Sequence, residues 1–171
     1  MLSSELIQQF HKFSEKGKPY DIVDARISNY IIEKNSLMII SGIPFYYAGG
    51  VYREDEGGIM IKTLIRNCMI EELQTAPRIE RVYRLLISDF QIQQEPDEIN
   101  LYPKHWINFR NGMLDVKTGE MHEHKPEYKA ICQIPHFMNF CRAEYQTETI
   151  KKCYLNFLEC VFFQKSFFQN L

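Results

Sequence analysis

The 171-residue sequence lacks the motifs of several enzyme classes. No GxxxxGK[ST] loop occurs, so the chain has no P-loop to hold a triphosphate, and we expect no nucleotide hydrolysis from it. The GxSxG, HExxH and zinc-deaminase patterns are missing as well. The acidic clusters Glu54–Glu56 and Asp97–Glu98 are each contiguous, so neighbouring side chains diverge instead of converging on a metal ion. We therefore expect no catalytic residues and no cofactor.

Long apolar runs and paired cysteine motifs are also absent. No stretch approaches the roughly 18 apolar residues of a membrane span, and the N-terminus has no signal-peptide apolar region. The five cysteines are odd in number and form no CxxC motif, which indicates reduced thiols. These features predict a cytoplasmic protein without membrane contact.

Excess positive charge is missing too. The formal net charge is −2, while 45% of the residues are hydrophobic and 25% are charged. This composition allows a sizeable core in a soluble protein. Because the charge is close to balanced, binding to nucleic acid would require a local basic patch.

The periodicity of apolar residues changes twice along the chain. Helical spacing predicts helices over 4–16, 20–33, 58–73, 77–90 and 143–160. Short strands are expected at 37–40, 45–47 and 51–53. We predict an α+β fold, with helices packed around a small antiparallel sheet.

The clearest local signal is a β-hairpin near 106–116. Residues 106–109 and 113–116 alternate around Asn111-Gly112, a dipeptide that favours a tight turn. A third short strand is expected near 121–124, and residues 131–134 are a candidate for one more.

Basic residues recur on the two central predicted helices. Lys62 and Arg66 are spaced i, i+4 on one, and Arg78, Arg81 and Arg84 recur every three residues on the next. If the helices pack as a helix-turn-helix, these side chains can pair with DNA phosphates, with the hairpin as the wing of a winged helix. The alternative is a solvated face with ion pairs to Glu71, Glu72 and Glu80.

The best metal candidate is the set His122, His124, Cys132 and His136. Two histidines separated by one residue project from the same side of a strand, and a thiol with a third imidazole can complete a tetrahedron. The spacing matches no established zinc motif. The alternative, which we favour, is a set of ordinary polar residues at a hairpin edge, so no metal is predicted.

The segment Trp106–Pro135 resembles a signature of phage and plasmid primase-helicases, "INF-x-NG-x-LD-x-x-TG-x-x-x-x-H-x-P … x-IP". In those proteins, and in poxvirus primase-helicases, it belongs to the domain that precedes the superfamily III helicase. The matching residues are Ile107, Asn108, Phe109, Asn111, Gly112, Leu114, Asp115, Thr118, Gly119, His124, Pro126, Ile134 and Pro135.

The resemblance implies a domain over about 20–162, preceded by a helical extension (1–19) and followed by a Phe-rich tail (163–171). We expect the polar and glycine residues of the motif to serve structure first, because they form turns and satisfy backbone groups. These residues are Asn108, Asn111, Gly112, Asp115, Thr118, Gly119, His124 and Pro126.

The resemblance implies a role in DNA replication in a bacterial host cell. We expect a non-catalytic module that binds DNA or organises the helicase oligomer, with DNA, replication proteins or a further copy as partners. The alternative is a stand-alone interaction or inhibitory factor derived from a phage replication protein. No helicase motor motif is present, so the sequence is either a stand-alone version, a truncated remnant or a fragment.

Overall fold

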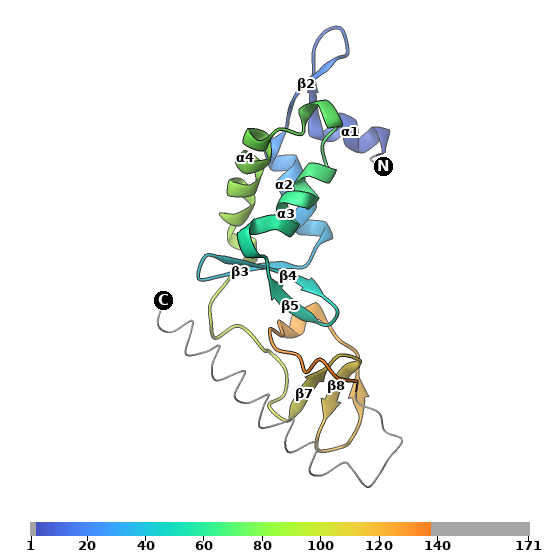
Figure 1. The fold of residues 1–171 in the computed structure, drawn as a ribbon, viewed down its shortest axis with the longest axis vertical. Helices are drawn as coiled ribbons and strands as arrows, with labels where there is room; N and C mark the ends of the chain where they lie inside the picture. The colour runs from blue at the N-terminus through green and yellow to red at the C-terminus, as the bar shows by residue number, and fades with distance from the viewer. Residues whose placement is uncertain (1–2, 138–171) are drawn as a thin grey trace. The chain divides into compact units, whose positions relative to one another are not determined.

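A computed structural model of the chain describes residues 3–137 (Figure 1). The predicted helix at 143–160 and the Phe-rich tail at 163–171 lie outside these residues. The described part contains four α-helices and three small sheets, so the predicted α+β class is confirmed. Among the described residues, no helix has the length and apolar character needed to cross a membrane.

The chain forms two compact units. We call residues 3–46 and 54–93 the helical unit, and residues 47–53 and 94–137 the sheet unit. Strands β4 (Ile43–Ala48), β5 (Val51–Glu54) and β6 (Gln93–Gln94) each cross a border between the units. The other elements of the helical unit are α1 (Ser4–Phe10), β1 (His11–Phe13), β2 (Pro19–Ile22), α2 (Asp24–Lys34), β3 (Leu37–Ile40), α3 (Ile59–Asn67) and α4 (Ala76–Ile87).

The core of the helical unit forms where α2, α3 and α4 pack against one another (Figure 1). Each helix contributes two fully buried apolar residues spaced i, i+4, which places both on the same face. These pairs are Ile27 and Ile31, Ile61 and Ile65, and Val82 and Leu86. The helical periodicity in the sequence therefore identified the buried faces correctly.

The N-terminal helix is shorter than predicted. It ends at Phe10, and residues 11–13 pair with 19–22 as an antiparallel hairpin. For the same reason α2 begins at Asp24 and not at residue 20. The buried His11 ring supports this arrangement: its Nδ1 lies 2.8 Å from the Ile7 carbonyl, and its Nε2 accepts from the Ile70 N–H at 3.2 Å. Hairpin pairing with the strand that follows, together with the contact between His11 and Ile70, overrides the local helical pattern here.

Helix α3 ends at Asn67, earlier than the predicted residue 73. Cys68 closes the last turn by donating to the Ile65 carbonyl at 3.0 Å. Met69 and Leu73 nevertheless stay buried, because the chain after the helix folds back over the core. At the other end, the buried Asp55 carboxylate accepts from the Met60 and Ile61 N–H groups at 2.8 and 2.9 Å and thereby caps the first turn.

The sheet unit is built on three strands, β7 (Trp106–Phe109), β8 (Gly112–Asp115) and β9 (Met121–His122), in that order. The predicted hairpin and its third strand are confirmed. The turn is one residue earlier than predicted, because Gly112 already pairs with Phe109 and the turn is Arg110-Asn111. A Cβ on Gly112 would lie 2.9 Å from the His122 carbonyl oxygen, so glycine permits the close approach of β9.

Residues 131–134 do not form the additional strand that the sequence pattern allowed. Phe109 and Ile134 make one isolated parallel bridge, and the Ile134 N–H donates to the Asn108 carbonyl at 2.8 Å. The segment is instead held by side-chain hydrogen bonds, described below. On the helical unit, the predicted strand at 37–40 is confirmed, and it turns into β4 through Ser41 and Gly42, both with positive φ.

Gly57 and Gly58 before α3 provide a matched pair of variants. Both have a φ near +70°, but only at Gly58 would a Cβ lie 2.6 Å from the Tyr83 ring of α4. Gly57→Ala should lower the free energy of unfolding by about 1 kcal/mol through backbone strain. Gly58→Ala should lower it by about 2–4 kcal/mol, because steric overlap adds to that strain. Urea denaturation measures both, and equal losses would contradict a close α3–α4 contact at this position.

Candidate functional site

The basic residues predicted on α3 and α4 form two clusters. In the first, Glu80 accepts from both Lys62 and Arg84, at 3.2 and 3.3 Å, and the Lys62 ammonium lies over the Tyr83 ring. The hydrogen bond from Lys62 lowers the pKa of Glu80, and Arg84 adds to this effect. The expected ion pair to Glu80 is therefore present, whereas Glu71 and Glu72 pair with no basic residue in the part of the chain that the structure describes.

The second cluster joins α4 to β2 and α2. Arg78 and Arg81 lie 3.3 and 3.2 Å from the Asp21 carboxylate, and Arg81 also lies 2.6 Å from Asp24. Lys12 adds a third cation to Asp21 at 3.5 Å. Burial raises the pKa of Asp21, but the Ile22 N–H and the two guanidinium groups outweigh this and hold it well below its usual range. The hydrogen bond from Arg81 to Asp24 in turn raises the pKa of Arg81.

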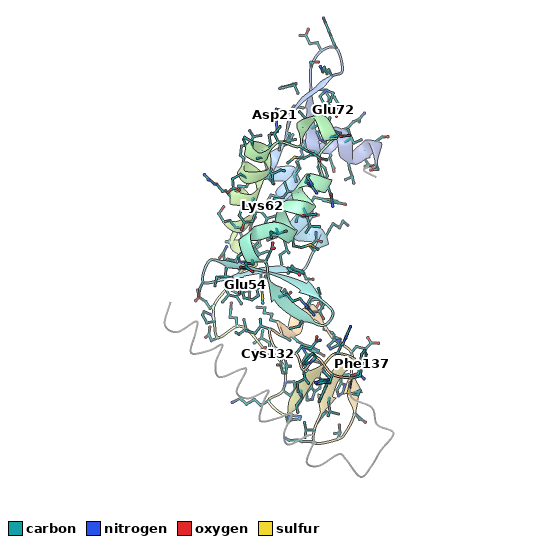
Figure 2. All side chains as sticks on the ribbon, viewed as in Figure 1. Asp21, Glu54, Lys62, Glu72, Cys132 and Phe137 are labelled. Carbon is teal, nitrogen blue, oxygen red and sulfur yellow. The ribbon has the colours of Figure 1, made fainter. Side chains whose placement is uncertain are left out.

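Arg66 differs from the other four basic residues. It is exposed near the end of α3 and makes no ion pair with any residue between 3 and 137. Figure 2 labels Lys62 on α3 and Asp21 on β2, at separate places along the helical unit. The structure thus groups Lys62 with Arg84 and Arg78 with Arg81, and leaves the charge of Arg66 uncompensated.

A groove lies between α3 and α4, on the same surface as the first cluster. Its volume is about 410 Å³. The lining residues are Ile59, Lys62, Thr63, Arg66, Ala76, Ile79 and Glu80. Ile59 is 71% exposed although it begins α3, so the groove presents an apolar side chain to solvent beside two cations. No sequence pattern indicates this groove, because each lining residue is typical of an ordinary helix face.

The family-like motif forms a buried polar centre in the sheet unit. The Asn108 amide nitrogen donates to the carbonyls of Gly50 and Cys132, both at 3.0 Å. The His124 Nε2 lies 2.9 Å from the Asn108 Oδ1 and 2.8 Å from the Phe109 carbonyl. Both of these oxygens accept only, so the Nε2 of His124 must carry the proton. One side chain thus ties β7 to two segments that are distant in sequence.

Gly50 completes this centre. Its φ is +87°, and a Cβ at this position would lie 2.5 Å from three atoms of the His124 ring. Next to it, the Gln133 amide donates to the Gly49 carbonyl at 2.7 Å. Gly49-Gly50 is a turn signal in the sequence, but nothing local in the sequence indicates that His124 packs against it.

The remaining motif residues shape the turns of the hairpin sheet. The Asp115 carboxylate accepts from the Lys117 and Thr118 N–H groups at 2.8 and 3.3 Å, and His105 lies 3.6 Å from it. Burial raises the pKa of Asp115, and these backbone N–H groups lower it below its ordinary value. The Thr118 hydroxyl accepts from the Glu120 N–H at 3.2 Å, and Gly119 between them has a φ of +77°. Asn111 lies in the β7–β8 turn, and Pro126 begins a 3-10 turn (Pro126–Tyr128).

The candidate metal ligands do not converge. The His122 ring stacks on Trp106 with centroids 4.2 Å apart and planes 8° apart. His124 is engaged with Asn108, Cys132 is buried, and His136 is exposed. Within residues 3–137, no three His, Cys, Asp or Glu side chains are arranged to hold a metal ion.

The polar centre predicts a large effect for Asn108→Ala. The carbonyls of Gly50 and Cys132 would lose a buried donor, while the His124 N–H keeps the Phe109 carbonyl as an acceptor. Each buried group left without a partner costs about 1–3 kcal/mol. We expect the free energy of unfolding to fall by about 2–4 kcal/mol. Urea denaturation followed through Trp106, the single tryptophan, measures this in the sheet unit itself. Gln133→Ala, which removes a donor at a less buried position, should cost less than about 1 kcal/mol, and an equal cost would contradict a central role for Asn108.

The Asp21 cluster predicts a pH-dependent stability. A carboxylate whose folded pKa is lowered contributes stability above its unfolded pKa of about 3.9 and loses it as the pH falls. Asp21→Asn should therefore lower the free energy of unfolding by about 1–2 kcal/mol at neutral pH. The difference from wild type should shrink when urea curves are measured at about pH 3. Glu72→Gln, on an exposed carboxylate of the same unit, is the control and should leave the free energy of unfolding unchanged at both pH values. A loss for Asp21→Asn that does not depend on pH would contradict the charge-based explanation.

Comparison with known proteins supplies the family. No curated protein matches this chain. The family described as "D5 N terminal like" matches residues 25–163, which is more than half of the sequence and includes the complete hairpin motif. The predicted resemblance is thereby confirmed. The chain belongs to the D5 N-terminal-like family, whose domain precedes the superfamily III helicase in phage and viral primase-helicases.

Proposed function

We propose that this chain is a non-catalytic module that organises the oligomer of a primase-helicase through protein–protein contacts. The observation that carries the proposal is the open groove between α3 and α4, which presents Ile59 at 71% exposure next to Arg66. Exposed apolar surface rimmed by charged residues is typical of a protein contact. Residues that are well buried in an interface supply most of its binding energy.

The pairing of the basic residues supports the same proposal. A DNA phosphate that approaches Arg78 or Arg81 must compete with Asp21 and Asp24, which already lie within 2.6–3.3 Å of them. In the first cluster, Glu80 accepts from both Lys62 and Arg84, and its negative charge reduces their attraction for DNA. The exposed apolar residues of the same unit, by contrast, remain accessible to a protein partner: Phe90 is 83% exposed and Leu85 is 43% exposed.

DNA binding is the second candidate, and two observations favour it. Arg66 has no acidic partner among the described residues, and the Arg84 side chain is 77% exposed despite its contact with Glu80. With Lys62, these side chains give one surface three cations against the single carboxylate of Glu80. A contact of this kind would be electrostatic and independent of base sequence.

Sedimentation velocity of the full chain separates the two candidates. We expect self-association between about 1 and about 100 µM, because this range covers modest protein affinities. The association should persist in high salt, since salt screens charges but not apolar contacts. A chain that stays monomeric throughout this range would contradict the proposal.

Fluorescence anisotropy with a forked DNA is the matched measurement for the second candidate. Salt-dependent binding by the wild type, with a salt slope reduced by about one in Arg84→Ala, would identify a phosphate contact. If this occurs in a monomeric chain, DNA binding replaces oligomer organisation as the function. If the DNA does not bind at tens of micromolar, the second candidate is excluded.

A further inference from the structure

The groove has a charge pattern as well as an apolar floor. Ile59, Ala76 and Ile79 supply the apolar surface, while Lys62 and Arg66 stand together along α3. Glu80 neutralises Lys62 but leaves Arg66 without a partner among residues 3–137. A matching ligand therefore carries an apolar side chain and, close to it, negative charge.

The same chain presents such a ligand at Phe90. This residue opens a 3-10 turn (Phe90–Ile92) directly after α4 and is 83% exposed. The turn is well anchored, because Ile92 is buried in the core of the helical unit and Asp89 accepts from the Gln91 N–H at 2.9 Å. Gln93 also donates to the Ile87 carbonyl at 2.8 Å. The backbone around Phe90 is therefore held in place while its side chain is exposed, which lowers the entropic cost of ordering the backbone on binding.

Negative charge follows Phe90 in the sequence. Glu95, Asp97 and Glu98 come five to eight residues later, and none forms an ion pair with a described residue. The Glu95 N–H donates to the Glu98 carboxylate at 3.1 Å, which holds the segment as a turn. Phe90 lies in the helical unit and this segment in the sheet unit, and the two properties that the groove requires follow one another within nine residues of the sequence.

The α4 part of the groove lies away from the Phe90 of its own chain. Its α4 residues, Ala76, Ile79 and Glu80, belong to the first half of the helix, whereas Phe90 follows the last turn. At 1.5 Å per residue, Ile79 and the end of α4 at Ile87 are about 12 Å apart along the helix. A second copy of the chain is the occupant that these residues favour.

We propose that the α3–α4 groove binds Phe90 of a second copy, with the following acidic segment beside Lys62 and Arg66. This inference rests on the proposed function and specifies its interface. Because groove and ligand are different surfaces, a head-to-tail contact leaves a pair of copies with one free groove and one free Phe90. Repetition of such a head-to-tail contact generates a ring or an open chain, whereas a two-fold pair would use both grooves and both Phe90 side chains.

Two exposed substitutions test the pairing without disturbing the core. Ile59→Asp alters the groove and Phe90→Ser removes the ligand, and both side chains are mostly exposed, so circular dichroism and the urea midpoint should match wild type. Each variant alone should sediment as a monomer of 20.4 kDa at concentrations where wild type associates. Leu85→Ser, on an exposed apolar residue of the same unit, is the control and should associate as wild type does.

An equimolar mixture of the two variants gives the decisive measurement. Ile59→Asp retains Phe90 and Phe90→Ser retains the groove, so the mixture should form a 1:1 heterodimer and stop at twice the mass of 20.4 kDa. The charge contribution has its own test: Lys62→Glu with Arg66→Glu should weaken association on the order of tenfold or more. Mixing that variant with one carrying Glu95→Lys and Asp97→Lys should restore part of this loss.

The outcomes separate this inference from the proposed function. Undiminished association of either single variant, or a mixture that stays monomeric, overturns the groove–Phe90 contact and leaves oligomer organisation intact. Equal loss in Leu85→Ser also overturns it, because general apolar adhesion would then explain the association. A wild-type chain that never associates overturns both.

Discussion

The ion pairs between α4 and the acidic residues Asp21 and Asp24 determine which charges of the helical unit are left uncompensated on its surface. They connect α4 to β2 and α2, which lie more than fifty residues earlier in the sequence. Partly buried pairs of this kind are strongly coupled to the fold, since removing one member leaves the other charge uncompensated. The arginines that look most like a DNA-binding stripe in the sequence are thus the ones most occupied with holding the helix in place.

The polar residues of the sheet unit serve a different purpose. Asn108 makes three side-chain hydrogen bonds: its amide nitrogen joins β7 to Gly50 and Cys132, and its amide oxygen accepts from His124. A fully satisfied buried network defines a single arrangement of its segments, because every alternative leaves an unpaired group. Here the segments that it joins have little regular structure, so the side chains supply the order that a continuous sheet would otherwise give.

The elements were predictable where the interaction that forms them is local. Strand β3, the hairpin near 106–116 and the buried faces of α2, α3 and α4 follow from apolar spacing and turn residues. The helix expected over 4–16 was wrong beyond Phe10, because residues 11–13 find hairpin partners at 19–22 that periodicity cannot reveal. The turn between β7 and β8 lies one residue earlier than the Asn111-Gly112 dipeptide predicted. Glycine is required at position 112 by the close approach of strand β9 and not by the turn itself.

The candidate site was less predictable than the fold. The arginine spacing located α4 correctly, but the partners Asp21 and Asp24 are more than fifty residues away. Of the three acidic partners proposed nearby, only Glu80 pairs with a basic residue among the residues that the structure describes. The α3–α4 groove has no signature, because it depends on how two helices pack and on which apolar residue is left outside the contact. A family motif such as that of Trp106–Pro135 identifies the fold because its residues build the fold, as Asn108, Gly112 and His124 do here. For that reason the motif carries little information about the ligand, and recognition has to be sought on surfaces that the motif does not contain, such as the groove and Phe90.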